Sequence, residues 1–211
     1  MKTPPRKRVG ILIFQDVEVL DFCGPFEVFA LVRHNEERRW QDSSPFEVLL
    51  VAEQAHEIRA FGGLRVAPDC TIDDCPSLDI LVVPGGLGTR TQVDNPRLIA
   101  WIAQRAKTVE TLTSVCTGAI LLGKAGLLDG KPATTHFRAL DWMRESFPNV
   151  EVHGELNVVE TDNGRTLTSA GISAGIDMAL QVVARYCGEE VARATARFME
   201  YAYPEDNRRR V

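Results

Sequence analysis

The chain has 211 residues, of which 45% are hydrophobic and 25% charged, and its 24 basic and 29 acidic side chains give a net charge of −5. This composition excludes a disordered chain, a collagen-like chain and a coiled coil. The net negative charge argues against a nucleic-acid partner. No apolar run approaches the ~18 residues of a membrane span. The basic start lacks the apolar core of a signal peptide, so we expect a cytoplasmic protein with no membrane partner.

Strands and helices are predicted to alternate along the chain. Continuous apolar runs rich in branched residues are typical of strands buried on both faces, and helical spacing separates them. In chain order, we expect a strand over 9–14, a helix over 20–32, a strand over 46–51, a hairpin around Gly62 and Gly63, a strand over 78–83, a helix over 95–106, a strand over 109–114, a helix running to Leu128, an extended piece over 133–135, a helix over 138–146, a hairpin over 158–168 and helices over 172–186 and 189–201.

This alternation predicts an α/β fold with a mostly parallel sheet and helices on both faces. No linker-like segment divides the chain, so we expect a single domain over 1–211, with loose termini at 1–7 and 204–211. Ligands of such sheets bind beyond the carboxyl ends of the strands, and the residues at those ends are therefore the candidates for function.

The sharpest chemical signal lies at the end of the fourth long strand. Cys116 follows this strand, and the small residues Thr117 and Gly118 lead into a helix. The pattern is that of a nucleophile elbow with sulfur in place of oxygen. The partial positive charge at the helix N-terminus is expected to favour the thiolate. The alternative is that Cys116 is only a buried apolar side chain.

Two further segments stand at predicted strand ends. Gly85 and Gly86 follow the strand over 78–83, and their amides, with that of Thr117, are expected to form an oxyanion hole. Asp21 lies among apolar residues. It is either the N-cap of the following helix or a carboxyl with a raised pKa that exchanges protons with a reacting group.

His136 and the four other cysteines give weaker indications of function than Cys116. His136 ends a short extended piece, and it either orients the thiol or is structural. The cysteine count is odd and no CxxC pair exists, so we expect no disulfide framework and no metal site. A redox partnership of Cys23 with Cys116 is a minor option. The five cysteines are at positions 23, 70, 75, 116 and 187.

The motifs at these strand ends resemble those of the ThiJ/PfpI superfamily, part of the class I glutamine amidotransferase-like folds. The resemblance extends from Val9 to about Tyr201. Within the superfamily the chain is similar to the isonitrile hydratase branch, and the same motifs occur in the ligand domain of AraC-type regulators. The segments that carry it are LDFCGPFEV at 20–28, VPGG at 83–86, TSVCTGA at 113–119, AGLLDGKPATTH at 125–136 and SAGISAGID at 169–177.

The resemblance implies a flavodoxin-like three-layer sandwich, a homodimer with the site near the interface, and a small-molecule substrate. In the isonitrile hydratases, the residues that match Cys116, Thr117 and Asp21 convert an isonitrile and water into an N-substituted formamide. No metal or organic cofactor is implied. The remaining expected site residues are Gly85, Gly86, Gly171 and Ile172 around the substrate, with His136 behind them.

The expected reaction starts when the Cys116 thiolate attacks the terminal isonitrile carbon while Asp21 supplies a proton to that carbon. Water then hydrolyses the thioimidate. Phe22 and Cys23 put a bulky ring and a second thiol where a site wall is expected, and Asp16 and Glu18 add charge near the mouth of the site. These four residues leave the identity of the substrate open.

Two other classes of function compete with this interpretation. The first is another cysteine enzyme of the superfamily, glyoxalase-like or amidase-like, with a protease least expected. The second is a ligand or oxidation sensor, because an exposed cysteine of low pKa is easily oxidised. A regulator would carry a helix-turn-helix domain after this one, and the ten residues after Tyr201 leave no room for it, so DNA binding is not expected.

Overall fold

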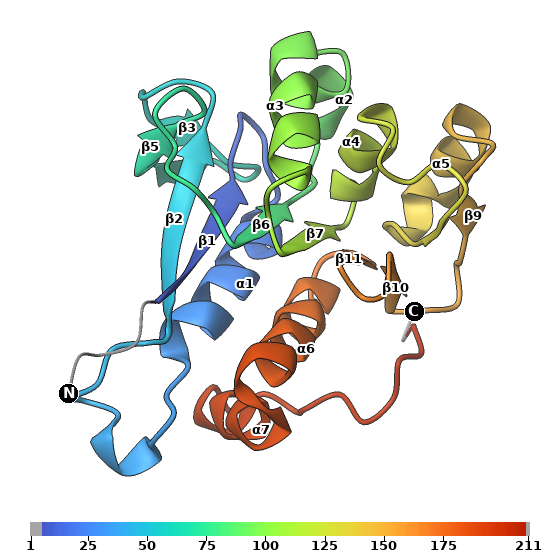
Figure 1. Ribbon diagram of the computed structural model, residues 1–211. Coiled ribbons are helices and arrows are strands. Elements are labelled where there is room, and N and C mark those ends of the chain that lie inside the picture. Colours follow the sequence, from blue (N-terminus) through green and yellow to red (C-terminus); the bar gives the residue numbers. More distant parts are fainter. Residues whose placement is uncertain (1–5, 210–211) are drawn as a thin grey trace.

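A computed structural model describes residues 6–209, and its centre is a seven-stranded sheet in the order β10-β11-β7-β6-β1-β2-β5 (Figure 1). All neighbours are parallel except β10 and β11, which form the antiparallel hairpin expected at this point of the chain. The strands are β1 (Lys7–Leu12), β2 (Phe46–Ala52), β5 (Cys70–Thr71), β6 (Ile80–Val83), β7 (Thr111–Val115), β10 (Val158–Thr161) and β11 (Thr166–Ser169).

Helices cover both faces of the sheet, as Figure 1 shows, and this confirms the expected α/β sandwich. On one face lie α1 (Val19–Leu31), α6 (Ala174–Cys187) and α7 (Glu189–Phe198); on the other lie α2 (Thr89–Gln92), α3 (Pro96–Ala106) and α4 (Gly118–Lys124). Helix α5 (Leu140–Ser146), the 3-10 helices Glu36–Arg38 and Phe137–Ala139, and the small pairs β3 (Ile58–Arg59) with β4 (Arg65–Val66) and β8 (Pro132–Ala133) with β9 (Glu151–Val152) lie outside these layers.

Three neighbouring strands bring the candidate segments together. Because β1, β6 and β7 are parallel neighbours, the chain leaves all three at one edge of the sheet. There Val17 forms an isolated bridge with Gly86, and the N–H of Glu18 donates to the Gly85 carbonyl at 2.9 Å. Gly86 has a φ of +127°, which favours glycine. The segment before α1 is thereby joined to the turn after β6.

The helix after the elbow is shorter than predicted. It ends at Lys124 rather than Leu128, because Gly126 adopts a φ of +70°. The N–H of Leu127 donates to the Leu122 carbonyl at 3.1 Å and that of Gly126 to Gly123 at 2.9 Å, which is a Schellman stop. Helix α6 also begins later than predicted, because residues 171–173 form a turn beside the site.

The end of the chain is held rather than loose through residue 209. Strand β10 is the edge of the sheet, and the Asn207 side chain satisfies Val158 by accepting from its N–H at 2.8 Å and donating to its carbonyl at 2.7 Å. Arg209 donates to the Thr135 carbonyl at 2.8 Å. Lys7 lies in β1. The other parts of the predicted loose termini, 1–5 and 210–211, lie outside the described residues.

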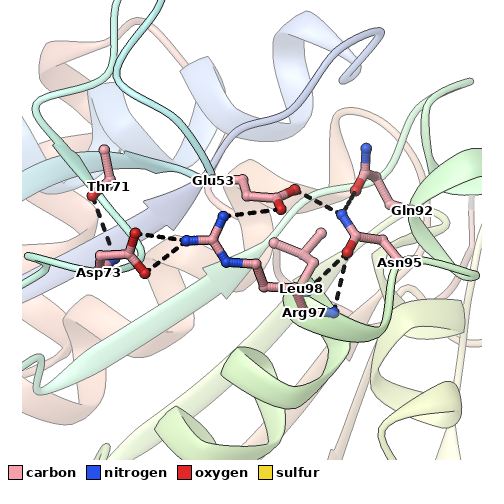
Figure 2. A network of polar contacts seen from close by, with 7 residues as sticks. All are labelled: Glu53, Thr71, Asp73, Gln92, Asn95, Arg97 and Leu98. Atoms are coloured by element: carbon pink, nitrogen blue, oxygen red, sulfur yellow. Dashed lines mark hydrogen bonds and ion pairs between the residues drawn. The ribbon is translucent and has the colours of Figure 1, made fainter.

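Helix α3 is fixed to the sheet by a polar network at its N-terminus (Figure 2). The side chain of Asn95 caps the helix by accepting from the N–H groups of Arg97 and Leu98 at 3.1 and 3.3 Å. The same side chain donates to Glu53, just after β2, at 2.7 Å. Arg97 forms an ion pair with Asp73, which follows β5, at 2.6 Å.

No helix within residues 6–209 is long and apolar enough to span a membrane.

We expect Asn95→Ala to lower the free energy of unfolding by about 1–2 kcal/mol, because it removes the cap and leaves Glu53 without this donor. Urea unfolding followed by circular dichroism measures the change. Asn95→Asp keeps the capping acceptor but places a second carboxylate beside Glu53, so its stability should be intermediate. An Asn95→Ala protein that unfolds at the wild-type urea concentration would contradict the assignment.

Candidate active site

Cys116 sits at the turn between β7 and α4 in a strained backbone conformation. Its φ is +57°, a value uncommon outside glycine, and its side chain is 6% exposed. The hydroxyl of Thr135 donates to the Cys116 carbonyl at 2.8 Å, and the Cys116 N–H donates to the Ala170 carbonyl at 3.1 Å. Gly118 is required beside it, since a Cβ there would lie 2.0 Å from the Val83 oxygen. The turn therefore has the strained strand-to-helix geometry of the elbow that the sequence predicts.

Asp21 is fully buried in the first turn of α1, and its carboxyl faces the elbow. Its Oδ2 accepts a hydrogen bond from the Gly85 N–H at 2.9 Å. The other oxygen, Oδ1, has no well-aligned hydrogen bond within residues 6–209, and the carboxyl interacts with the Cys116 thiol. Since Glu18 is the N-cap of α1, the alternative that Asp21 is a helix cap is wrong.

Burial keeps the Asp21–Cys116 pair protonated at neutral pH. Loss of solvent raises the pKa of Asp21 to about 8, although the Gly85 N–H opposes the change. Burial, and then the charge of Asp21, also raises the pKa of Cys116 above its usual value, while the N–H and hydroxyl of Thr117 lower it. The expectation that the helix N-terminus makes Cys116 a resting thiolate is therefore wrong, because desolvation outweighs these dipoles.

The glycine amides of the predicted oxyanion hole already have partners. The N–H of Gly85 is donated to Asp21, and that of Gly86 to the Thr117 Oγ1 at 3.0 Å. A second hydroxyl, that of the buried Thr89, lies 2.9 Å from the Thr117 Oγ1. Gly85 and Gly86 thus orient the acid and the threonine, and the Thr117 N–H stays near the sulfur. Nothing in the sequence pattern pointed to Thr89.

A cavity of about 370 Å³ opens over the sulfur, and most of its wall is apolar. Cys116, Thr117, Gly86 and Ile172 line it, as expected, and so does His136, which was expected behind the substrate. The other expected residues, Asp21, Gly85, Phe22 and Cys23, do not line it. Gly171 lies behind the sulfur, and a Cβ there would be 3.1 Å from Sγ. The other lining residues are Glu18, Phe61, Leu87, Arg90, Arg138, Ala139 and Trp142.

His136 forms one side of the cavity and is not a base for Cys116 in this arrangement. Its Nδ1 accepts from the backbone N–H of Arg138 at 3.2 Å. Burial, and the charges of Arg209 and Arg138, lower the pKa of the imidazole, so it is neutral at pH 7. Its ring lies beside Gly171 and lines the cavity directly, rather than standing behind the substrate residues as expected.

We expect wild-type stability to fall relative to Asp21→Asn as pH rises from 5 to 7. The folded carboxyl holds its proton until about pH 8, whereas the unfolded one loses it near pH 4, so unfolding releases a proton in this range. The free energy of unfolding should decline by about 1.4 kcal/mol per pH unit relative to the amide, which keeps the Gly85 contact. Urea unfolding at several pH values measures this, and parallel profiles would refute the raised pKa.

Comparisons with known proteins place the chain in a family. The model of the DJ-1/PfpI family matches residues 7–185. An isonitrile hydratase of Pseudomonas putida is 34% identical over 195 residues, 92% of this chain and 78% of that protein. The HTH-type transcriptional regulator GbdR of Pseudomonas aeruginosa is 27% identical over 94% of this chain, which spans about half of that protein (53%).

Solved structures show the same fold. A ThiJ/PfpI family protein from Pseudomonas syringae superposes with a TM-score of 0.81 at 28% identity, over 96% of this chain and 78% of that one. DJ-1beta of Drosophila melanogaster gives 0.77 at 18% identity, over 94% of this chain and 100% of that one. With its strained cysteine elbow and its sheet order, the chain belongs to the DJ-1/PfpI family.

Proposed function

We propose that the protein is an isonitrile hydratase, which adds water to an isonitrile to give an N-substituted formamide. The observation that carries the proposal is the contact between a fully buried, neutral Asp21 and the thiol of Cys116, and Cys116 in turn lines a largely apolar cavity. The 34% identity with the hydratase of Pseudomonas putida supports it.

Isonitrile hydration requires an acid and a nucleophilic sulfur that are directed at the same carbon atom. The terminal isonitrile carbon must receive a proton and a nucleophile at the same atom, whereas an amide needs a donor set for its oxygen and a proton for its leaving nitrogen. Here the Gly85 and Gly86 amides are engaged elsewhere, and the His136 Nδ1 accepts from Arg138. This favours the hydratase over the amidase-like alternative.

In the first step, Asp21 gives its proton to the terminal carbon as the Cys116 sulfur bonds to that carbon. The reactive pair holds one proton, and it is the tautomer with that proton on Asp21 and with sulfur as the thiolate, which exchanges with the tautomer protonated on sulfur. The product is a thioimidate, R–N=CH–S–Cys116, beside an ionised Asp21. The Thr117 N–H, which lies near the sulfur, stabilises the thiolate from which the bond forms.

In the second step, Asp21 takes a proton from water as the water oxygen bonds to the same carbon, and it passes that proton to the nitrogen. The carbon then bears hydroxyl, sulfur and nitrogen on single bonds. In the third step, the hydroxyl proton moves to Asp21, the carbon–sulfur bond breaks, and the thiolate and the formamide R–NH–CHO are released. The sum is one isonitrile and one water, and no metal or organic cofactor is required.

The homodimer, the small-molecule substrate and the cytoplasmic location belong to the same proposal. Several large apolar side chains near the cavity are exposed, Phe61 at 50%, Leu87 at 54% and Phe137 at 52%. Their exposure is consistent with a dimer that covers this region, as the family resemblance implies. Light scattering of the purified protein determines the oligomeric state.

We expect Cys116→Ala to abolish formamide production from a simple alkyl isonitrile and Asp21→Asn to leave a trace, about 1% or less, because each removes one half of the addition at carbon. Formamide is measured by chromatography and mass spectrometry. Cys23→Ala, which changes a thiol that does not line the cavity, is the matched control and should keep wild-type activity.

The alternatives give different results in the same experiment. Formamide from no isonitrile, together with loss of methylglyoxal, would replace the hydratase with a glyoxalase-like enzyme. No turnover of either would favour a ligand sensor, and full activity of Asp21→Asn would remove its role.

We expect kcat/KM for the isonitrile to rise about tenfold per pH unit below the pKa of Asp21 and to level off near pH 8. The reason is that the reactive pair holds one proton and the resting pair holds two below about pH 8. Initial rates between pH 6 and pH 9, corrected for reaction without enzyme, measure the profile. A rate that is flat or falls over pH 6–8 would contradict the assigned protonation.

A further inference from the structure

Two arginines on the rim of the cavity come from segments that are far apart in the sequence. Arg90 lies on α2, and Arg138 lies in the 3-10 helix before α5; both are exposed, whereas Cys116 on the floor is 6% exposed. The mechanism above uses neither of them.

The two cations have no carboxylate within ion-pair distance among residues 6–209, unlike many arginines of this chain. Arg90 instead lies over the ring of Trp142, 5.4 Å from its centroid, which holds the guanidinium at the wall. Glu18 is the one carboxylate among the residues that line the cavity. The cavity therefore carries a net positive charge in a protein whose net charge is −5.

The shape of the cavity leaves room beyond the reacting group. Its volume of about 370 Å³ lies at the lower end for small-molecule sites, and an isonitrile group fills only a small part of it. Phe61, Leu87 and Trp142 contribute apolar side chains to its wall. A fitting ligand thus has a reactive end, an apolar middle and a polar distal end near the arginines.

We propose that the substrate is an isonitrile with an anionic group, such as a carboxylate, at the end opposite the isonitrile, and that Arg90 and Arg138 bind this group. The inference rests on the proposed function for the reactive end only. Planar guanidinium groups suit a carboxylate because they donate two parallel hydrogen bonds to it. Arg90 and Arg138 then determine specificity, while Asp21 and Cys116 perform the reaction.

The kinetic test compares 3-isocyanopropanoate with its neutral methyl amide. We expect the wild-type protein to have at least about tenfold higher kcat/KM for the carboxylate, with the difference mainly in KM. Arg90→Gln and Arg138→Gln should each reduce that ratio, and the double variant should bring it near one. Arg144→Gln, which removes an exposed arginine of α5 outside the cavity, is the matched control and should keep the ratio.

A binding measurement separates this inference from the reaction. Calorimetry with the Cys116→Ala protein, which has no nucleophile, should show tighter binding of the carboxylate than of the amide, and the preference should decrease at high salt and in the double arginine variant. Equal binding, or binding of neither compound, would overturn the inference. Turnover of both compounds at equal kcat/KM would overturn it while the hydratase stands, and a retained binding preference without turnover would overturn only the hydratase.

Discussion

The hydrogen bond from the Gly85 N–H to the Asp21 Oδ2 is the contact on which the site depends. It joins the turn after β6 to the first turn of α1 and occupies one oxygen of a fully buried carboxyl. The other oxygen is left to carry the proton and to face Cys116. The orientation of the acid therefore comes from the parallel arrangement of β1, β6 and β7, since these strands end side by side.

The buried carboxyl and the strained elbow lower the free energy of unfolding of the protein, and the same two features are the ones that the proposed reaction uses. A buried carboxyl with a raised pKa disfavours folding above the pKa of the unfolded chain, and the left-handed conformation of Cys116 adds backbone strain. The surrounding sheet compensates, because β6 and β7 are buried on both faces and Thr135 and Ala170 hold the elbow by hydrogen bonds. The strain is thus localised at one residue between a strand and a helix.

The sequence predicted the layers and the elbow because these follow from local patterns: apolar runs for buried strands, and a cysteine followed by small residues before a helix. It failed where the outcome depends on tertiary contacts. The ionisation of Cys116 is determined by burial and by Asp21, and the partners of Gly85 and Gly86 come from distant segments. The hydrogen bonds that fix the C-terminal segment depend on the unpaired edge of β10 at Val158. Arg90 lines the cavity only because the fold brings α2 beside it.

The account therefore depends on Asp21 being a neutral carboxylic acid in the folded protein at pH 7. Infrared difference spectroscopy of wild type against Asp21→Asn tests this directly, because a protonated carboxyl has a carbonyl band that a carboxylate lacks. We expect the band at pH 7 in the wild type, with loss of intensity as the pH rises through about 8. A carboxylate signal for Asp21 at pH 7, with no carbonyl band, would contradict the account.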